Sequence, residues 1–511
     1  MTEVSVLDLA PVDGATAASP SAPAFFADLN LDQIVASALA GKEEYDLAPF
    51  FHRTLRTAGE VAYRQAVMRD LEDAATHAAV SKFAERMRQV RSRLAQIDKL
   101  YYAYQKQAWR LDAVSDYCQA IDSLRSSLLE ARPKSVALAR FIAFLDGYVG
   151  TASFRDMRDE AESLRAKLAD IRYFLVVGGG VITVTEFRDE DDYGAEIEAD
   201  FAKFKRGDAG EYAFRFVESP AMNHIEARIL ERVALMNPDV FAALDAFAAR
   251  YADFVDPVIQ RFDREIQFYV SYLAHMRRIA NGELGFCHPE VSETSKETLM
   301  QDCFDLALAG AAREKGVRVV VNAATLSRSE RIIIVSGPNQ GGKTTFARMF
   351  GQAHYLAALG LPVPGKMAKL FLFDQLFTHF EREETVANLR GKLHDDLSRL
   401  HAALAAATSR SLFILNEAFN STSLSDAIFL NTQILARIVA LDAICVCVTF
   451  IDELAALSRT TVSMASTVRP DNPAERTFKV VRRPPDGLAY ALSVAEKHKL
   501  TYNQLQARLS L

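Results

Sequence analysis

The pattern of apolar and polar positions divides the chain into two parts. From residue 28 to about residue 284, apolar residues recur every three or four positions, which predicts helices. After about residue 285, short β-branched runs alternate with helical segments, which predicts an α/β domain with a mostly parallel sheet and helices on both faces. Residues 1–27 are rich in Ala, Pro, Ser and Asp and have few large apolar side chains, so we expect a disordered tail.

Three long apolar stripes mark the helical part. In residues 83–111 apolar side chains alternate at spacings of four and three, which predicts one coiled-coil-like helix that packs along another long helix. A second stripe over residues 154–175 predicts a helix that ends at the glycines of residues 178–180. The third stripe, over residues 244–273, predicts a long helix kinked at Pro257.

A small β-containing excursion separates the second and third stripes. Residues 181–187 are typical of a strand, and residues 189–192 form an acidic turn. We therefore predict a helical core domain over residues 28–150, a pair of lever helices with a small tip over residues 151–284, and an α/β domain over residues 285–511.

The expected elements of the α/β domain follow from the same pattern. The predicted strands are residues 317–321, 331–335, 370–373, 411–415, 443–449 and 478–481. The predicted helices are residues 343–358, 390–407, 424–440 and about 451–457.

The helix predicted over residues 83–111 also carries seven Lys and Arg residues interleaved with Tyr102 and Trp109. Such a surface could face nucleic acid, or the cations could be ordinary solvated charges. The second interpretation is favoured because the cations are spread around the helix and acidic residues share its surface.

A glycine-rich stretch stands between a predicted strand and a predicted helix. It fits the pattern G-x-x-x-x-G-K-[ST] at Gly337, Gly342, Lys343 and Thr344. Glycines allow successive backbone N–H groups to turn towards phosphate oxygens, and the helix N-terminus adds positive potential. A glycine-rich turn without a ligand would not need Lys and Thr directly behind its last glycine, so we predict a phosphate loop.

A phosphate loop needs a second strand that ends in an acidic group. Residues 412–417 are the best candidate, because Glu417 follows an apolar run about 70 residues beyond the loop. The alternative is a core strand with a polar end. Asn416 stands where an Asp is expected, and its neutral amide adds no charge for Mg²⁺ binding.

These residues resemble the MutS mismatch-repair ATPases. The resemblance covers about the last 225 residues with high specificity and extends more loosely upstream. It is carried by these segments: residues 337–345, Leu361-Pro-Val-Pro364, Asp374-Gln-Leu-Phe-Thr378, Asn416-Glu417, Thr422-Ser423 with Asp426, and Thr449 before Glu453-Leu454.

The resemblance implies an ATPase of the ABC type that uses ATP and Mg²⁺ and forms a homodimer through its ATPase domain. It makes Glu417 the catalytic base and Lys343 a second catalytic residue, with Thr344 and Asn416 at the metal. It places Thr422, Ser423 and Asp426 at the dimer face. The implied nucleotide-binding residues are Asn322, Gly337, Pro338, Asn339, Gln340, Gly341, Gly342, Lys343, Thr344 and Thr345.

The departures from the family pattern are equally informative. Asn416 replaces the usual Asp, and Phe450 stands where the family has a His, which removes a γ-phosphate sensor. The serine that the family supplies across the dimer falls at Gly391 or Lys392. We therefore expect ATP binding with slow hydrolysis. We also expect no mismatch-reading domain, no connector domain and no nuclease-like C-terminal extension, and so a short branch of the family.

Composition narrows the cellular setting. The net charge of −7 gives no global electrostatic case for nucleic-acid binding, although a local basic surface remains possible. No window approaches 18 uninterrupted apolar residues, so no transmembrane helix is predicted. The five cysteines lack zinc-ligand spacing and no signal peptide is evident, which favours the reducing cytoplasm.

Two functions remain open at this point. The first is an ATP-gated homodimer that couples nucleotide state to the binding of duplex or branched DNA. The second is an ATP-dependent scaffold that holds a protein partner between its levers, for which an acidic tip is no obstacle. A phosphotransferase fits less well, because no acceptor-binding signature is visible.

Overall fold

The computed structural model describes residues 4–9, 21–187, 222–381, 391–469, 472–484 and 506. The chain forms two compact units, which we name the sheet unit and the helical unit. The sheet unit comprises Met1–Ala74, Lys134–Ala139 and Arg264–Leu511, and the helical unit comprises Ala75–Pro133 and Arg140–Asp263. The predicted boundaries at residues 150 and 284 are therefore not those of the compact units.

The first long stripe forms a helical hairpin and not one helix. Helix α5 (Ala74–Ile97) and helix α6 (Ala103–Ala131) are separated by a short turn. Arg86 donates to the Gln119 carbonyl and Arg93 pairs with Asp116, so the two helices run antiparallel. The apolar stripe of α5 therefore packs against the stripe of α6, which follows it in the sequence. Arg91 pairs with the buried carboxylate of Asp263, and these internal contacts account for three of the seven cations.

The second stripe changes from helix to strand before its end. Helix α8 (Ala152–Ala169) begins at the Thr151 cap, and strands β1 (Tyr173–Gly178) and β2 (Val181–Glu186) follow it as an antiparallel hairpin. The prediction of a helix up to residue 175 is wrong, because that apolar run pairs with β2. Gly179 and Gly180 have φ of +59° and +76°, as a two-residue hairpin turn requires. The acidic turn at residues 189–192 lies outside the described residues.

The third stripe is also two helices. Helix α11 (Pro238–Arg250) ends before helix α12 (Pro257–Ile279) begins, so the prediction of one kinked helix is wrong. Pro257 occupies the first position of α12, where its missing N–H costs nothing. Asp256 caps this end by accepting from the Val258 N–H at 2.7 Å. Two further helices between residues 136 and 236 are described, α7 (Val136–Val149) and α10 (His224–Met236).

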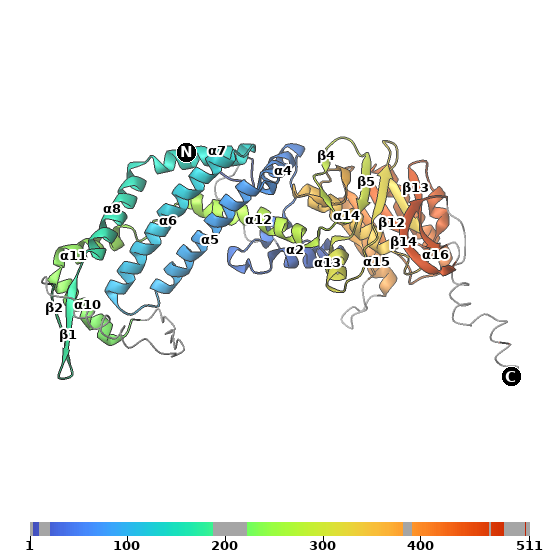
Figure 1. The fold of residues 1–511 in the computed structure, drawn as a ribbon. Helices are drawn as coiled ribbons and strands as arrows, with labels where there is room; N and C mark the ends of the chain where they lie inside the picture. The colour runs from blue at the N-terminus through green and yellow to red at the C-terminus, as the bar shows by residue number, and fades with distance from the viewer. Residues whose placement is uncertain are drawn as a thin grey trace. The chain divides into compact units, whose positions relative to one another are not determined.

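The sheet unit is built on a six-stranded sheet in the order β10-β11-β12-β7-β13-β14, and its elements appear in Figure 1. The strands are β7 (Ile332–Ser336), β10 (Leu376–His379), β11 (Leu412–Asn416), β12 (Ile444–Val448), β13 (Thr461–Arg469) and β14 (Asn472–Arg482). The first five pair in parallel, and only β14 is antiparallel. This confirms a mostly parallel sheet.

Helices cover both faces of this sheet, as predicted. Helix α14 (Lys343–Ala358) lies on one face, where Gly351 approaches Ile414. Helices α15 (Lys392–Ala406) and α16 (Leu424–Ala440) and the 3₁₀ helix η2 (Asp452–Ala456) cover the other face around a buried apolar cluster. The predicted bounds of α14 and α16 are confirmed.

A second, four-stranded sheet was largely missed by the sequence pattern. Its order is β4-β9-β5-β6, with β4 (Glu290–Ser292), β5 (Thr298–Cys303), β6 (Asn322–Leu326) and β9 (Met367–Phe371). The strand predicted at residues 317–321 is wrong, since pairing with β5 begins only at Asn322. Strands β3 (Phe286–Cys287) and β8 (Val363–Pro364) form a separate pair, and helix α13 (Leu306–Glu314) joins β5 to β6.

The N-terminal residues belong to the sheet unit. The elements here are α1 (Phe25–Asp28), α2 (Leu31–Leu39), η1 (Glu43–Tyr45), α3 (Ala48–His52) and α4 (Ala58–Glu72). Gln352 on α14 donates to the Leu29 carbonyl, so the start of the predicted core domain packs on the sheet unit. The prediction of a disordered tail is wrong for residues 4–9, because Val6 and Leu7 are 1% and 2% exposed, and for residues 25–27, which belong to α1.

Among the residues that the structure describes, no single helix is long and apolar enough to cross a membrane. Helices α7 and α8 meet the length and composition criteria only as a pair, and the pair is bent by 63° at its break.

Candidate functional site

The glycine-rich loop, residues 337–345, joins the buried strand β7 to the first turn of α14. Gly337, Gln340 and Gly342 have φ of +113°, +58° and +90°, so the loop turns repeatedly through the left-handed region. A Cβ atom at Gly337 or Gly341 would lie 2.6 or 2.5 Å from the Ser466 hydroxyl on β13. Glycine is therefore required by space at both positions, and at Gly337 also by conformation.

Lys343 is 4% exposed, and its ammonium group is held by its own loop. Its Nζ donates to the Gly337 carbonyl at 2.9 Å and to the Asn339 side-chain oxygen at 3.3 Å. The ring of Phe450 lies 4.5 Å from the same ammonium, which is a cation–π contact. Burial lowers the pKa of Lys343, and the carboxylate of Glu417 opposes that shift.

The end of β11 brings a second group of predicted residues to the loop. Thr344 Oγ1 donates to Asn416 Oδ1 at 2.9 Å, and Glu417 Oε1 lies 4.0 Å from Lys343 Nζ. The meeting follows from topology, because β7 and β11 are parallel and their carboxyl ends share one edge of the sheet. Residues 72 positions apart thus form one cluster of hydroxyl, amide, carboxylate and ammonium groups.

Glu417 is held in an unusual conformation. Its φ is +53°, which is strained for a residue with a side chain, and its N–H donates to the Val448 carbonyl at 2.9 Å. Asn420 donates to its second carboxylate oxygen at 3.2 Å. The strained turn directs the carboxylate towards Lys343, which is within ion-pair distance.

The oxygen atoms at this cluster suit a hard cation only in part. The described residues contain no group of three or more His, Cys, Asp or Glu side chains that could hold a metal ion. Thr344 Oγ1 and Asn416 Oδ1 are adjacent neutral oxygens, and Mg²⁺ is commonly held by few protein ligands together with phosphate oxygens and waters. The residues therefore supply part of a Mg²⁺ site, which phosphate oxygens and waters would complete.

Asn322, predicted to contact nucleotide, lies beside a bulge in β14. Its side-chain N–H₂ donates to the Phe478 carbonyl at 3.2 Å, and its side-chain oxygen accepts from the Val480 N–H at 2.8 Å. Phe478 has φ of +58°, and its backbone lies against Gly342. Both ends of the Asn322 amide thus hold the bulge against the loop.

The same bulge brings in a residue that the motif search missed. Ser466 pairs with Val480 while Val468 pairs with Arg476, so extra residues of β14 stand opposite Thr467. Arg476 Nε donates to the Asn339 carbonyl at 3.2 Å, and its charge contributes to the lowered pKa of Lys343. No sequence motif marks this position, because the register shift is a property of the strand pair.

The predicted dimer-face residues form the cap of α16. Ser423 Oγ accepts from the Asp426 N–H at 3.2 Å and donates to the Asp426 carboxylate at 2.7 Å. Thr422 donates to the same carboxylate. On α16 beside them, Leu424 and Phe429 are 68% and 62% exposed. Lys392 forms an ion pair with Glu381.

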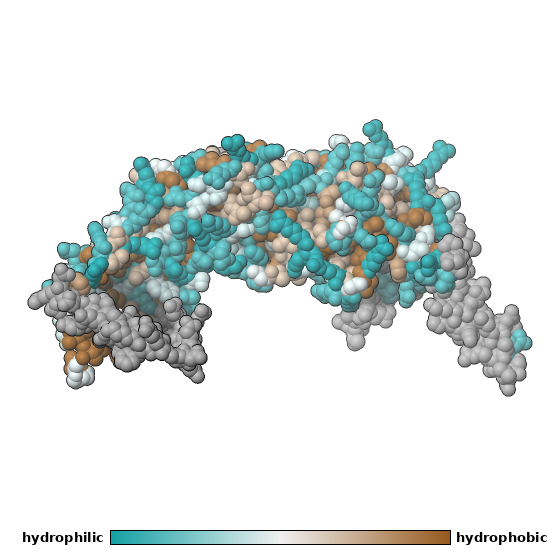
Figure 2. Space-filling model, viewed as in Figure 1, coloured by the Kyte–Doolittle hydropathy of each residue, from teal (hydrophilic) through white to brown (hydrophobic). Residues whose placement is uncertain are grey.

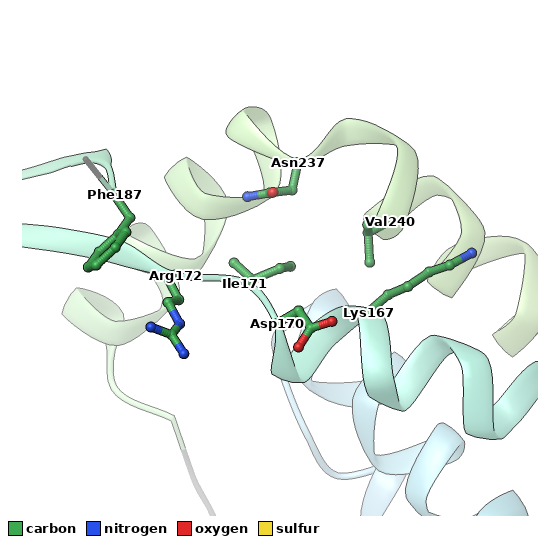
Figure 3. A pocket seen from close by; sticks show the side chains of 7 residues that line it. All are labelled: Lys167, Asp170, Ile171, Arg172, Phe187, Asn237 and Val240. Atoms are coloured by element: carbon green, nitrogen blue, oxygen red, sulfur yellow. The ribbon is translucent and has the colours of Figure 1, made fainter. Parts of the chain in front are cut away.

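A separate hollow of about 480 Å³ lies in the helical unit (Figure 3). Lys167, Asp170 and Arg172 line it together with Ile171, Phe187, Asn237 and Val240. None of the predicted site residues lines this hollow.

Comparison with known proteins adds the family. Residues 333–504 match the family described as MutS domain V. The DNA mismatch repair protein MutS of Erythrobacter litoralis (strain HTCC2594) is 33% identical over 156 residues, which cover 30% of this chain and 18% of the relative. The proteins of the same name from Brevibacillus brevis and Chlorobium phaeobacteroides are 25% identical over 257 residues and 27% identical over 217 residues.

The alignments with these last two proteins cover 48% and 40% of this chain but only 29% and 23% of the relatives. The sheet and its glycine-rich loop therefore define the class, which is that of MutS domain V. These partial matches support a MutS-related protein, and the aligned parts span less than a third of the length of these relatives.

Proposed function

We propose that this protein binds ATP with Mg²⁺ at residues 337–345 and hydrolyses it slowly. The observation that carries the proposal is that the glycine-rich loop and the end of β11 meet. Thr344 is hydrogen-bonded to Asn416, and Lys343 Nζ lies 4.0 Å from the Glu417 carboxylate. The loop supplies turned backbone N–H groups and a helix N-terminus for phosphate. Lys343 is the cation for the outer phosphates.

Glu417 is the proposed general base, which orients and polarises the attacking water. Its position near Lys343 and its strained backbone support this role. Thr344 and Asn416 are the proposed Mg²⁺ contacts, and the metal would neutralise charge on the phosphates. The proposed cradle runs through Gly337, Pro338, Asn339, Gln340, Gly341, Gly342, Lys343, Thr344 and Thr345, and Asn322 supports it through β14.

Slow turnover is proposed for two reasons. Asn416 contributes no negative charge beside Thr344, so Mg²⁺ is held less firmly than by an Asp. Phe450 places an aromatic ring over Lys343 and has no hydrogen-bond donor or acceptor for a phosphate oxygen or a water. Both features weaken the arrangement of the outer phosphate more than the binding of the nucleotide.

The Lys343→Ala variant tests the nucleotide site. We expect ATP affinity to fall by at least about a hundredfold, since a charge-assisted contact to phosphate is lost. Binding is measured by titration with a fluorescent ATP analogue. The Glu417→Gln variant is the matched control: it keeps binding and loses hydrolysis. Retained ATP affinity in Lys343→Ala would place the nucleotide elsewhere.

We further propose that the protein acts as a homodimer on duplex or branched DNA. Its affinity for DNA would depend on the bound nucleotide. The relatives are named DNA mismatch repair proteins, which supports DNA as a partner. Exposed Leu424 and Phe429 beside the cap of α16 support a dimer face next to the nucleotide site.

DNA binding is tested with labelled duplex and branched DNA across a salt series, with and without ATP. We expect the affinity to fall steeply as salt rises, because bound counterions are released from phosphates. An absence of binding at low salt in both nucleotide states would remove DNA from the proposal.

A second candidate function is favoured by the β1–β2 hairpin. Val176, Val177 and Val181 are 56%, 73% and 61% exposed, and residues 173–186 contain no Lys or Arg. Apolar surface at the end of this hairpin is visible at the lower left of Figure 2. Such a surface suits a protein partner better than a phosphate backbone. A pull-down that depends on nucleotide and survives nuclease treatment would favour this function.

A further inference from the structure

The first described residues of the chain are bound to the sheet unit as a bent segment that is neither helix nor strand. Residues 5–8, Ser-Val-Leu-Asp, contact side chains of α4 and α12 and the loop before α4. We name the contacting set the segment site: Arg53, Tyr63, Arg64, Glu265 and Tyr269. All but Arg53 are buried.

The segment site contacts the backbone of the segment. Tyr63 donates to the Ser5 carbonyl at 2.6 Å, and Tyr269 donates to the Val6 carbonyl at 2.6 Å. Glu265 accepts from the Val6 N–H at 2.8 Å. Arg64 Nε donates to the Leu7 carbonyl at 2.9 Å. Three consecutive residues are thus held through main-chain groups by side chains far away in sequence.

Side chains of the segment add specificity. Ser5 Oγ donates to the Glu265 carboxylate at 2.8 Å and accepts from the Leu7 and Asp8 N–H groups. Val6 and Leu7 are buried in the sheet unit. Asp8 pairs with Arg53 and lies 3.9 Å from Arg64. The chemistry recognised is a hydroxyl, two aliphatic side chains and an acid, in that order.

This mode of attachment differs from that of a core strand. Among the described residues, the segment makes no strand pairing, and only two aliphatic side chains are buried to offset the ordering of six residues. Polar contacts to the backbone therefore provide much of the attachment, as they do when a protein recognises a peptide through its main chain. A free peptide of the same sequence can make the same contacts.

We propose that the segment site is a peptide-binding site, that residues 5–8 are its ligand within the same chain, and that this ligand is exchangeable. The site accepts a short bent peptide with the pattern hydroxyl, aliphatic, aliphatic, acid. The tethered copy is the resident occupant, because its effective concentration exceeds that of any free peptide.

The segment site is physically connected to the helix that follows the glycine-rich loop. Arg64 Nη1 donates to the carbonyl of Leu359, the C-cap residue of α14, while Nε holds Leu7. The Arg64 cation is buried at the negative end of the α14 dipole. Release of the segment would remove two partners, Leu7 and Asp8, from this buried cation.

The experiment uses the full chain with a protease site placed within residues 11–19, outside the described part. After cleavage the segment is no longer covalently connected to the rest of the chain and is held only by its non-covalent contacts with the segment site. A fluorescein-labelled peptide of residues 2–10 is then titrated and its anisotropy measured. We expect the cleaved chain to bind this peptide at least tenfold more tightly than the uncleaved chain, in which the tethered copy competes.

Two control peptides test the contacts. A peptide with Leu7→Asp loses the aliphatic contact, and a peptide N-methylated at Val6 loses the N–H that donates to Glu265 and carries a methyl group in its place. Each should bind the cleaved chain at least tenfold more weakly. The proposal is overturned if the labelled peptide does not bind, if the controls bind equally well, or if cleavage abolishes the folded circular-dichroism spectrum.

Discussion

At the scale of single residues, the amide of Asn416 has the clearest chemical meaning. The side chain accepts from Thr344 Oγ1, as a carboxylate at this position could, but it carries no negative charge. Glu417 keeps its carboxylate at 4.0 Å from Lys343. A substitution at residue 416 can therefore add a negative charge while it keeps the side-chain oxygen, or it can remove that oxygen.

The Asn416→Asp variant restores the charge. We expect half-saturation by Mg²⁺ at about tenfold lower concentration, which corresponds to about 1.4 kcal/mol, because carboxylate oxygen is a preferred ligand. Hydrolysis should also become faster. Phosphate release is measured across a Mg²⁺ titration, with Asn416→Ala as the control that removes the oxygen. Unchanged Mg²⁺ dependence in Asn416→Asp would mean that this residue does not face the metal.

At the scale of elements, the sequence predicts helices and strands whose bounds are set by a local pattern. It fails where the bounds depend on packing against a distant part of the chain. Helices α14 and α16 were predicted to the residue, because each has an apolar face and a clear start at Gly342 or Ser423. The apolar seam of α5 and α6 continues across a turn, since both helices bury the same kind of stripe. Periodicity therefore could not show the break between them.

The candidate site also contains residues that a local motif predicts and a residue that only the fold brings in. Lys343, Thr344, Asn416 and Glu417 carry motif spacing, and the structure brings them together. Arg476 carries none, because it reaches the loop only through the bulge that Asn322 holds. A contact created by a register shift between two strands leaves no periodic trace in either strand.

The Arg476→Gln variant tests this element. Arg476 adds a second positive charge close to Lys343, so we expect ATP affinity to fall about tenfold when the charge is removed. Arg476→Lys is the matched control and should retain most of the affinity. Binding is compared by the same fluorescent titration. Equal loss in both variants would indicate a structural effect on β14 instead of an electrostatic one.

At the scale of the whole molecule, compact units and predicted domains do not coincide. Residues 28–74 have the helical pattern of the predicted core domain, yet they pack with the sheet unit through contacts such as Gln352 to Leu29. Hydropathy shows that a helix has a buried face, but not which other element covers it. Boundaries placed where the hydropathy pattern changes from helical to α/β therefore differ from the boundaries of the compact units.

Assembly is the prediction that belongs to this scale. The exposed Phe429 lies on α16 beyond the cap formed by Ser423 and Asp426. If this face joins two copies, Phe429→Glu should abolish the dimer, because a charge would be buried at the contact. Mass is measured by light scattering after size exclusion with ATP present.

The control is Leu308→Glu on α13, which is also an exposed apolar residue of the sheet unit. It should leave the mass unchanged. A Phe429→Glu protein that remains dimeric would move the dimer face away from α16.

The buried residues Val6 and Leu7 also affect how this protein should be handled in the laboratory. A purification tag or dye attached at Met1 would sit only a few residues from side chains that are 1% and 2% exposed. Bulky fusions there would compete with the contacts of Ser5 and Asp8 for space near Arg53 and Glu265. Different tag positions could then give preparations with different melting temperatures, and a long flexible spacer after the tag would avoid this discrepancy.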